Sequence, residues 1–394
     1  MEKTLKPSLR FKGFTDAWEQ CKFSGIAEVK RGLTYKPSNV VAKGIRVLRS
    51  SNINDDYFER RVDDVFVTQE AINIDYVKSG DILITSANGS SRLVGKHAII
   101  NSTKDNSAVH GGFMLLARTA HPYYLNASMS SNWYKKFINL YVAGGNGAIG
   151  NLSKSNLDEY EILVPSDIER TRIGELFQSI DSLITLHQRK YDKLSNVKKA
   201  LLDKMFPKNG ELVPSLRFKG FTDTWEQCKV KNVCSISTGK SNTQDRIEDG
   251  AFPFYVRSPI IERSNRYLYD EEAVLTVGDG VGTGKVYHYV TGKYDLHQRV
   301  YRMFDFMEGV SAKYFYYYFS NYFYQRVMSM TAKSSVDSVR LEMISEMDIE
   351  IPSFGEQLNI AKTLNNLDNL ITLHQRKYEK LVNIKKALLQ KMFV

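Results

Sequence analysis

Apolar residues recur at helical spacing in two long stretches of the chain. In the first stretch one series has members seven residues apart, with His187 at its centre: Ile173, Ile180, Leu194 and Leu201. A second series lies between them and consists of Leu176, Leu183 and Val197. Two apolar series in one heptad are typical of a coiled-coil seam. After Gly174 neither Gly nor Pro occurs before Pro207, so we predict one helix of about 38 residues, about 57 Å long. That length suits a spacer, and an ordinary packed helical hairpin is the alternative.

The second stretch repeats the first almost residue for residue. Leu183–Phe206 and Leu370–Phe393 differ at four positions and lie 187 residues apart (370 − 183). The apolar series returns as Ile360, Leu367, Leu370, Leu381, Ile384 and Leu388. Another near-identical pair, Pro7–Lys22 and Pro214–Lys229, is offset by 207 residues (214 − 7). Near-identical ends around divergent middles predict one scaffold built twice, with two different working surfaces.

The divergent middles are Phe23–Pro165 and Val230–Pro352, and each has the size of one domain. Apolar runs bounded by Gly and Asp predict strands at Val62–Val67, Asp81–Thr85, His97–Ile100 and Gly112–Ala117, and at Phe252–Val256, Ala273–Val277, Lys285–Val290 and Arg299–Phe304. One helix per domain is expected, around Ala127–Tyr141 and Ala312–Met328.

We therefore predict an α+β protein with an internal pseudo-twofold repeat. Two mixed domains, residues 1–165 and 207–352, each lead through Pro-Ser into a long helix, residues 166–206 and 353–394. The seam and the pseudo-symmetry predict that the two helices pair antiparallel, as a coiled coil.

Composition narrows the class of partner. The chain of 394 residues has 54 Lys and Arg against 44 Asp and Glu, a formal net charge of +10, which favours nucleic acid over a membrane. An apolar run of about 18 residues is absent, so no membrane span is expected. The N-terminus lacks the apolar core of a secretory signal. The odd, widely spaced cysteines Cys21, Cys228 and Cys234 predict neither disulfides nor a zinc site, and a reducing cytoplasm is the expected location.

The sequence offers no complete catalytic motif. Val277–Lys285 is rich in glycine, but Asp279 and Val286 occupy positions where a Walker loop needs Gly and Ser or Thr. The loop is expected either to approach a phosphate closely or to be a plain tight turn. Pro-Pro is absent, so the tetrad of an adenine methyltransferase is missing, and no paired-carboxylate nuclease motif stands out. We expect no catalytic residue, metal or cofactor.

Two further features have structural interpretations. His187 and His374 occupy seam positions, where a polar residue that sets the helix register is preferred to a metal ligand. Tyr314–Tyr324 contains nine aromatic residues. Such a run can stack bases, and a buried helix face is the favoured interpretation.

The middles keep short matches to each other. Arg49-Ser50 matches Arg257-Ser258, Lys96 matches Lys285, and His110 matches His297, each beside a predicted strand. Together with the alternation of variable domains and near-identical helices, the PSLRFKGF segments and the strand-Pro-Ser junctions, this organisation resembles the specificity subunit of type I restriction–modification systems. The resemblance covers the whole chain, although His110 is followed by Gly111 where the second half has Gln298.

The resemblance implies a function in DNA recognition. Each middle would be a target recognition domain that reads one half of a bipartite sequence in double-stranded DNA, and the antiparallel helices would separate the two. Two modification subunits would supply N6-adenine methylation from S-adenosylmethionine, and restriction subunits would add ATP-dependent translocation and cleavage. The subunit itself would be no enzyme.

Polar residues on the predicted loops are the candidate DNA contacts. They are Arg49, Ser50, Asn52, Asn88, Ser90, Arg92, Lys96 and His110 in the first domain, and Lys240, Arg257, Ser258, Lys285, His297, Gln298 and Arg299 in the second. Two other functions remain open: a coiled-coil interaction scaffold without sequence-specific DNA binding, and a self-sufficient DNA methyltransferase or nuclease.

Overall fold

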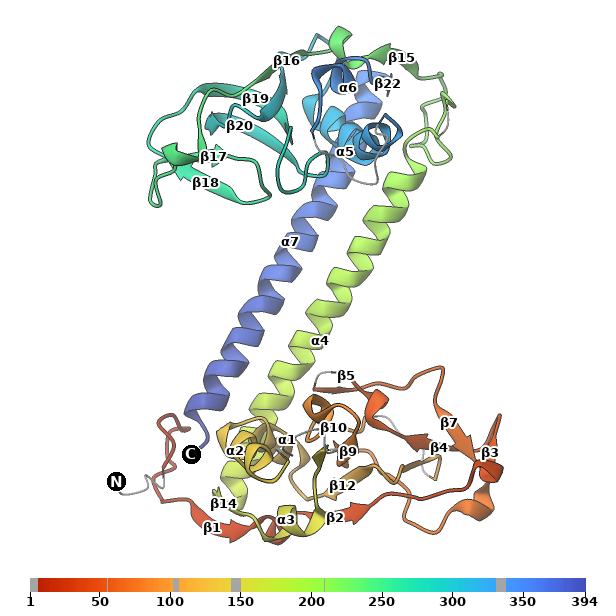
Figure 1. Cartoon of the computed structure of the whole chain (residues 1–394), viewed down its shortest axis with the longest axis vertical. Helices are drawn as coiled ribbons and strands as arrows, with labels where there is room; N and C mark the ends of the chain where they lie inside the picture. Colours follow the sequence, from red (N-terminus) through yellow and green to blue (C-terminus); the bar gives the residue numbers. More distant parts are fainter. Residues whose placement is uncertain (1–5, 55, 102–105, 143–149, 209, 331–337) are drawn as a thin grey trace. The chain divides into compact units, whose positions relative to one another are not determined.

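The chain folds into two compact units, each holding one mixed domain and one end of each long helix (Figure 1). The computed structural model describes residues 6–54, 56–101, 106–142, 150–208, 210–330 and 338–394. Unit 1 comprises residues 1–188 and 376–394, and unit 2 comprises residues 189–375.

The predicted long helices are confirmed. Helices α4 (Asp167–Lys204) and α7 (Phe354–Lys391) have 38 residues each. Each begins just after the Pro-Ser dipeptide that was expected to mark its start. Acidic residues lie in the first turn of each helix and a lysine lies in the last. These charges oppose the helix dipole at both ends and stabilise the helices.

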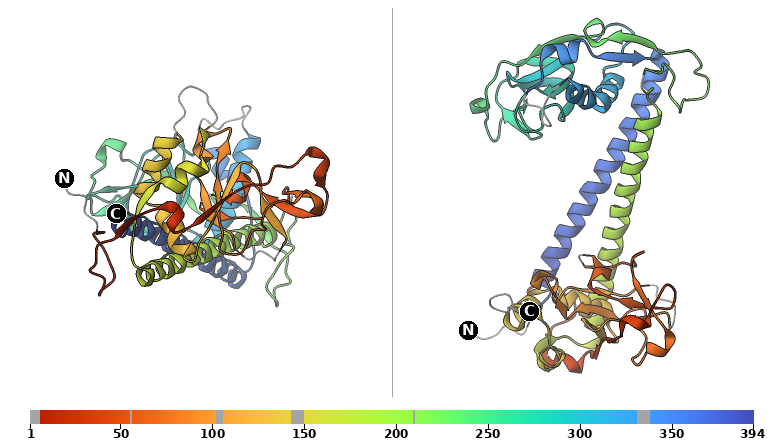
Figure 2. Two further views of the ribbon diagram at one scale, coloured as in Figure 1. Left: turned by 90° about the horizontal axis from the view of Figure 1, so that it is seen from below. Right: turned by 45° about the vertical axis from the view of Figure 1, so that its right-hand side comes forward.

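The antiparallel pairing is also confirmed, because each unit joins the start of one helix to the end of the other. In unit 1, Phe177 of α4 packs against Phe393, which follows α7, with ring centroids 5.8 Å apart. In unit 2, Met205 and Phe206, which directly follow α4, share a core with Ile360 near the start of α7. The right-hand view in Figure 2 shows the two helices unbroken.

One of the two predicted seam series is wrong. Ile173 and Ile180 are buried as expected, but Leu183 and Val197 are 44% and 40% exposed. The second buried series falls four residues after the first rather than three, at Phe177, Ile184 and Met205. The same shift leaves Leu370 and Ile384 exposed in α7. Both spacings fit a heptad, and the larger apolar groups that face the domain cores decide between them.

The domain of unit 1 contains two four-stranded sheets. The first, antiparallel, has the order β10 (His97–Ile99), β8 (Ile82–Thr85), β12 (Met114–Arg118), β2 (Glu28–Arg31). The second has the order β11 (Ala108–His110), β4 (Ile45–Leu48), β7 (Val65–Val67), β3 (Val40–Val41), with β11 parallel to β4. Short pairs join β5 (Ile53–Asn54) to β6 (Tyr57–Phe58), β9 (Ala87–Asn88) to β13 (Gly150–Asn151), and β1 (Glu19–Lys22) to β14 (Glu161–Val164).

Two predictions for this domain need correction. The helix expected over Ala127–Tyr141 is two helices, α1 (Pro122–Met129) and α2 (Asn132–Tyr141), with α3 (Lys154–Glu159) later in the chain. At the break, the Ser131 hydroxyl donates to the Ser128 carbonyl at 2.7 Å, a local bond that competes with the helix. The strand expected from Val62 begins at Val65, because Val62 is fully exposed.

The domain of unit 2 is built on one six-stranded sheet. Its order is β16 (Ser235–Thr238), β21 (Val300–Phe304), β19 (Tyr269–Val277), β20 (Tyr287–Leu296), β17 (Phe252–Tyr255), β18 (Ile261–Ser264). A separate pair joins β15 (Glu226–Lys229) to β22 (Asp348–Ile351), and the helices are α5 (Ala312–Ser329) and α6 (Leu341–Ser345). Strands β19 and β20 extend beyond the predicted apolar runs because their polar ends pair with each other. The aromatic residues of α5 form a buried core, which confirms the favoured interpretation.

The near-identical segments Pro7–Lys22 and Pro214–Lys229 dock in the same way on the helix ends of their own units. In unit 1 the Leu9 amide donates to the Lys391 carbonyl at 2.9 Å, and Arg10 binds both carboxylate oxygens of Glu169 at 2.9 and 2.6 Å. In unit 2 the equivalent contacts have the same lengths and join Leu216 to Lys204 and Arg217 to Glu356. The scaffold is therefore repeated in space as well as in sequence.

Candidate nucleic-acid interface

The candidate residues gather where two parallel strands end in each domain. In unit 1, β4 and β11 run parallel with His110 opposite Leu48, and Arg49 follows directly. In unit 2, β17 and β20 run parallel with Leu296 opposite Tyr255. One residue further on, His297 and Val256 come next to each other in the same register, and Arg257 follows. The structure thus confirms the match of Arg49 with Arg257 and of His110 with His297.

In each domain a third segment of the chain passes very close to the ends of the two parallel strands. A Cβ added at Gly32 would lie 1.9 Å from the Gly111 carbonyl oxygen, and one at Gly239 would lie 2.0 Å from the Leu296 carbonyl oxygen. Only glycine allows this approach. It brings Lys240, which is exposed, to the same loop cluster.

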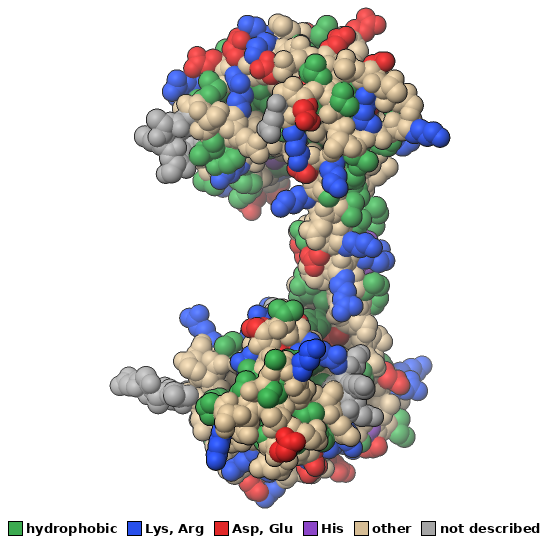
Figure 3. Space-filling model, turned by 90° about the vertical axis from the view of Figure 1, so that its right-hand side faces the viewer, with side chains coloured by type: hydrophobic (Ala, Val, Ile, Leu, Met, Phe, Trp, Pro, Cys, Tyr) green, Lys and Arg blue, Asp and Glu red, His purple; other side chains and the backbone are tan. Residues whose placement is uncertain are grey.

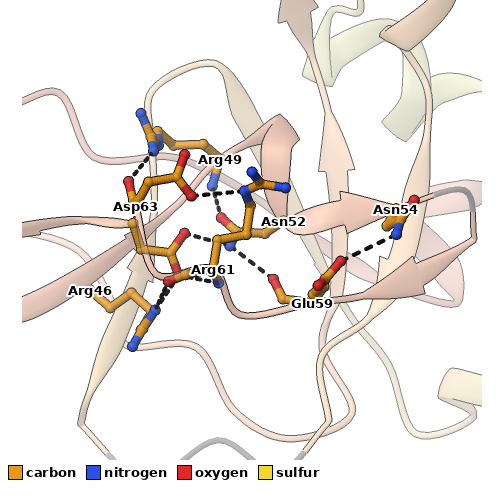
Figure 4. A network of polar contacts seen from close by, with 8 residues as sticks. Arg46, Arg49, Asn52, Asn54, Glu59, Arg61 and Asp63 are labelled. Atoms are coloured by element: carbon orange, nitrogen blue, oxygen red, sulfur yellow. Dashed lines mark hydrogen bonds and ion pairs between the residues drawn. The ribbon is translucent and has the colours of Figure 1, made fainter. Parts of the chain in front are cut away.

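A buried carboxylate organises the loop of unit 1. The Asp64 side chain is fully buried and accepts hydrogen bonds from the Asn52 side chain at 2.7 Å, from the Arg61 amide at 3.0 Å and from the Arg46 guanidinium. Figure 4 shows Arg46, Asn52 and Arg61 converging on this point. Nearby, the Arg49 guanidinium donates to the Asp63 carbonyl at 3.0 Å. This network fixes the direction of the backbone that carries Arg49.

Two of the candidates in unit 1 lie beneath the surface. The Asn52 side chain uses both ends of its amide, because it accepts from the Arg49 amide at 2.7 Å and donates to the Glu59 carbonyl at 3.0 Å. His110 is buried, with its Nε2 3.3 Å from the Lys30 carbonyl oxygen. In this conformation both residues support the loop from below.

The remaining candidates of unit 1 form a second, more exposed loop. The Asn88 side chain donates to the Ser50 hydroxyl at 3.0 Å and accepts from the Ser90 amide at 2.9 Å. Ser90 and Arg92 are exposed, and Lys96 is half-buried. The structure therefore brings Ser50 and Asn88 together, although 38 residues separate them in sequence.

In unit 2 an acidic residue of the glycine-rich loop holds two arginines. Asp279 lies 3.3 Å from Arg257 and 3.8 Å from Arg299, and the arginine side chains are 46% and 66% exposed. The Arg299 amide donates to Nδ1 of His297, which is itself buried. One carboxylate thus holds two guanidinium groups at the surface. The planar guanidinium is the side-chain group best suited to bidentate hydrogen bonding.

The other candidates of unit 2 surround this arginine pair. The Gln298 side chain donates to Asn242 Oδ1 at 2.6 Å, and the Lys285 ammonium lies 4.5 Å from the centre of the Tyr324 ring. Ser258 is half-buried, and its hydroxyl accepts from the Ile260 amide at 3.2 Å. The interface of unit 2 is therefore more open than that of unit 1, where a buried aspartate takes the central place.

Comparison with known proteins gives this arrangement a family. The model of the type I restriction modification DNA specificity domain matches the chain twice, over residues 15–196 and 222–383. The chain belongs to this family. Like other specificity subunits, it has a role in recognition rather than in catalysis.

Relatives agree with the assignment. A putative type I restriction enzyme MjaX specificity subunit from Methanocaldococcus jannaschii is 24% identical over 401 residues, covering 94% of this chain and 92% of the relative. The EcoDI specificity subunit from Escherichia coli is 26% identical over 143 residues, which span only 36% of this chain and 31% of that protein. A crystal structure of the S subunit of a type I system from M. genitalium has the same fold, with a TM-score of 0.69, 14% identity and 99% of both chains covered.

Several residues of this specificity subunit that shape the interface escaped the sequence analysis. Asp64 and Asp279 were not among the predicted contacts, yet Asp64 pairs with Arg46 and Asp279 pairs with Arg257 and Arg299. Arg266 was also missed; it donates to Asp245 at 2.7 Å and lies 3.5 Å from the buried Asp295. A search for carboxylates close in sequence to the arginine-bearing loops would have found Asp64. It would not have found partners that are distant in sequence, such as Asp279 and Asp295.

Over the part of the specificity subunit that the structure describes, three or more metal-binding side chains never come together at one point. Within that same part, no helix has both the length and the apolar character that a membrane crossing requires.

Acid should destabilise unit 1 through His110. Burial lowers the pKa of His110 to about 4, below its usual value of 6.5. Because the unfolded chain binds this proton more readily than the folded one, stability is full above the unfolded pKa and falls as the pH drops toward the folded pKa. We expect a loss of about 2 kcal/mol between pH 7 and pH 5 from this group, measured by urea unfolding at each pH.

His110→Gln should flatten this pH dependence without abolishing it. Burial also lowers the pKa of His97 in the same unit, so part of the slope belongs to that residue. An unchanged slope in His110→Gln would show that His110 is not held neutral by the fold.

Proposed function

We propose that this chain is the non-catalytic, sequence-specific DNA-binding subunit of a type I restriction–modification complex, in which each domain reads one half of a bipartite sequence in double-stranded DNA. The observation that carries the proposal is the repetition of one arrangement with different surroundings. An arginine follows the end of a parallel strand in both domains, at Arg49 and Arg257, on scaffolds that are nearly identical. A buried aspartate organises the first loop and an exposed glycine-rich loop the second, which fits two unlike half-sites.

The exposed and half-buried polar side chains are the proposed DNA contacts. Arginine can bind the O6 and N7 edge of guanine with two hydrogen bonds, while Asn, Gln and Ser can bind other base edges. We assign base contact to Arg49, Ser50, Asn88, Ser90, Arg92, Arg257, Ser258, Gln298 and Arg299. Lys96, Lys240 and Lys285 suit phosphate contact, which makes binding depend on salt. The buried Asn52, His110 and His297 would act by holding these loops in place.

Two copies of a modification subunit are the proposed partners on the helices. Leu183 and Leu186 of α4 lie exposed in unit 1, and their repeat counterparts Leu370 and Leu373 of α7 lie exposed in unit 2. Figure 3 shows hydrophobic side chains and Lys or Arg side chains together along the helical part of the surface. Two equivalent apolar sites suit two identical partners. These partners would carry out N6-adenine methylation from S-adenosylmethionine, and restriction subunits would add ATP-dependent translocation and cleavage.

Mapping methylated adenines in cells tests the proposal. Cells that contain the modification subunit are compared with and without this chain. We expect a bipartite methylated sequence that appears only when both proteins are present. A protein-interaction scaffold without DNA specificity would leave the methylation pattern unchanged. Methylation by the purified chain alone, with S-adenosylmethionine and DNA, would instead indicate a self-sufficient enzyme.

Loss of one exposed arginine should weaken one half-site. Arg299→Ala removes a guanidinium that is 66% exposed and held by Asp279. We expect the complex with the modification subunit to bind its cognate DNA about 10- to 100-fold more weakly, the value of one bidentate base contact. Binding is measured by fluorescence anisotropy at fixed salt, with DNA altered in either half-site.

The control for Arg299→Ala is Lys231→Ala. Lys231 is similarly exposed but pairs with Glu346 beside the scaffold strands. This variant should bind cognate DNA as the parent does. Equal weakening by both substitutions would mean that Arg299 acts only through net charge.

A further inference from the structure

The two long helices carry the same ion pair twice. In unit 1 the Lys385 ammonium lies 2.8 Å from the Asp181 carboxylate, and in unit 2 Lys198 lies 2.5 Å from Asp368. The aspartates and the lysines are each 187 residues apart (368 − 181 and 385 − 198), so equivalent repeat positions make both pairs. Each pair is partly buried and joins α4 to α7.

A tyrosine from the neighbouring domain covers each ion pair, and the two tyrosines come from unrelated elements. In unit 1, Tyr57 of strand β6 has its ring centre 5.9 Å from the Lys385 ammonium. In unit 2, Tyr317 of helix α5 donates its hydroxyl to Asp368 at 2.8 Å, and the Lys198 ammonium lies 5.6 Å from its ring centre. The helices thus present one repeated feature, and each domain meets it with its own tyrosine.

In unit 1 the element that carries Tyr57 is tied directly to the candidate DNA loop. The hairpin β5–β6 begins right after Asn52, and its two ends are joined by hydrogen bonds between Asn52 and Glu59 of 2.9 and 3.0 Å. Asn52 also accepts from the Arg49 amide (Figure 4). One short hairpin therefore connects the helix pair with the backbone of Arg49.

In unit 2 helix α5 makes the corresponding connection. Tyr317 lies in its first half, and Tyr324 in its second half lies under the Lys285 ammonium. The Tyr287 hydroxyl donates to the Gly284 carbonyl at 2.5 Å, and its ring packs against two phenylalanines of α5. The glycine-rich loop is thus held by the same helix that covers the ion pair.

We propose that Tyr57 and Tyr317 are positioning residues that tie the reading loop of each domain to the Asp–Lys pair of the helices, and so determine which gap between the half-sites is accepted. The inference rests on the proposed function. An Asp–Lys pair in a helix seam costs desolvation that an apolar pair would avoid. Its occurrence at both repeat positions, each time under a domain tyrosine, fits a role in fixing geometry, as polar seam residues do elsewhere.

The test measures gap preference rather than activity alone. The full chain is expressed with the modification subunit in cells that carry a plasmid library with the two half-sites at varied gap lengths. Methylation is then read for every gap. In Tyr57→Ala and Tyr317→Ala, methylation at gaps one base pair off the preferred length should rise about tenfold relative to the preferred gap, as expected from losing one contact to a charged group. Tyr317→Phe, which keeps the ring but loses the bond to Asp368, should fall between parent and Ala variant.

Tyr141→Ala is the control for Tyr57→Ala, because both tyrosines are similarly exposed in unit 1. Tyr314→Ala is the control for Tyr317→Ala, because Tyr314 is an equally buried tyrosine of α5 whose hydroxyl donates to the Glu350 carbonyl rather than to the ion pair. They should keep the parental preference. A uniform loss of methylation at every gap in the Tyr57 and Tyr317 variants would indicate a merely stabilising role and overturn the inference, as would an unchanged preference. If the parent itself methylates without regard to the half-sites, the proposed function fails first, and the inference with it.

Discussion

Replacing Arg10 with Ala is expected to destabilise unit 1 by about 3–5 kcal/mol. The Glu169 carboxylate at the start of α4 is only 1% exposed, and Arg10 satisfies both of its oxygens. Without the guanidinium, a buried charge would remain unpaired, and its desolvation would no longer be offset. Urea unfolding followed by tryptophan fluorescence measures the loss, since Trp18 lies in the core of unit 1.

The chain supplies a matched variant for this prediction. Arg217 binds Glu356 in unit 2 with the same geometry and the same exposure. Arg217→Ala should therefore destabilise unit 2 by a similar amount and leave unit 1 unaffected. Lys22→Ala, which removes only an exposed pair with Glu159, should have no measurable effect. Loss of stability in Lys22→Ala comparable to that in Arg10→Ala would show that burial is not the cause.

Combined replacement of Arg10 and Glu169 by apolar residues of similar size should restore most of the stability, because no unpaired charge is then buried. If the double variant is as unstable as Arg10→Ala, the ion pair itself stabilises the docked N-terminal segment.

The long helices were predictable because their signal is local. A heptad repeat that lacks Gly and Pro and occurs twice in the chain predicts the length of each helix and its pairing with the other helix. This prediction needs no knowledge of the domains. The exact buried series was not predictable, since Leu176 and Phe177 both fit a heptad next to Ile173. Only the core around Phe393, which comes from the other end of the chain, selects Phe177.

The candidate interface was predictable in position but not in role. Short matches such as Arg49-Ser50 with Arg257-Ser258 located the ends of the parallel strands. Burial decides whether a polar side chain faces the surface, and burial depends on distant partners. Asn52 is enclosed by Glu59 and Asp64, so it could not be distinguished from an exposed asparagine by sequence alone.

A chain with two copies of the second domain should methylate a sequence that contains the second half-site twice. The design replaces residues 23–160 with a copy of residues 230–347. The two insertion points are equivalent, because the Phe23 amide donates to the Tyr160 carbonyl at 2.8 Å and the Val230 amide to the Met347 carbonyl at 2.9 Å. The flanking strand pairs β1–β14 and β15–β22 stay in the scaffold with matching registers.

The copied domain should fit its new place because the surfaces that receive it are repeated. Its copy of Tyr317 would meet Asp181 and Lys385 instead of Asp368 and Lys198, which are the same repeat positions. Adenine methylation is mapped in cells that supply the modification subunit, with the parent chain as control. The first half-site should disappear completely, and the second should remain. If the first half-site persists, residues 23–160 do not read it, and the scaffold repeats contribute to base recognition.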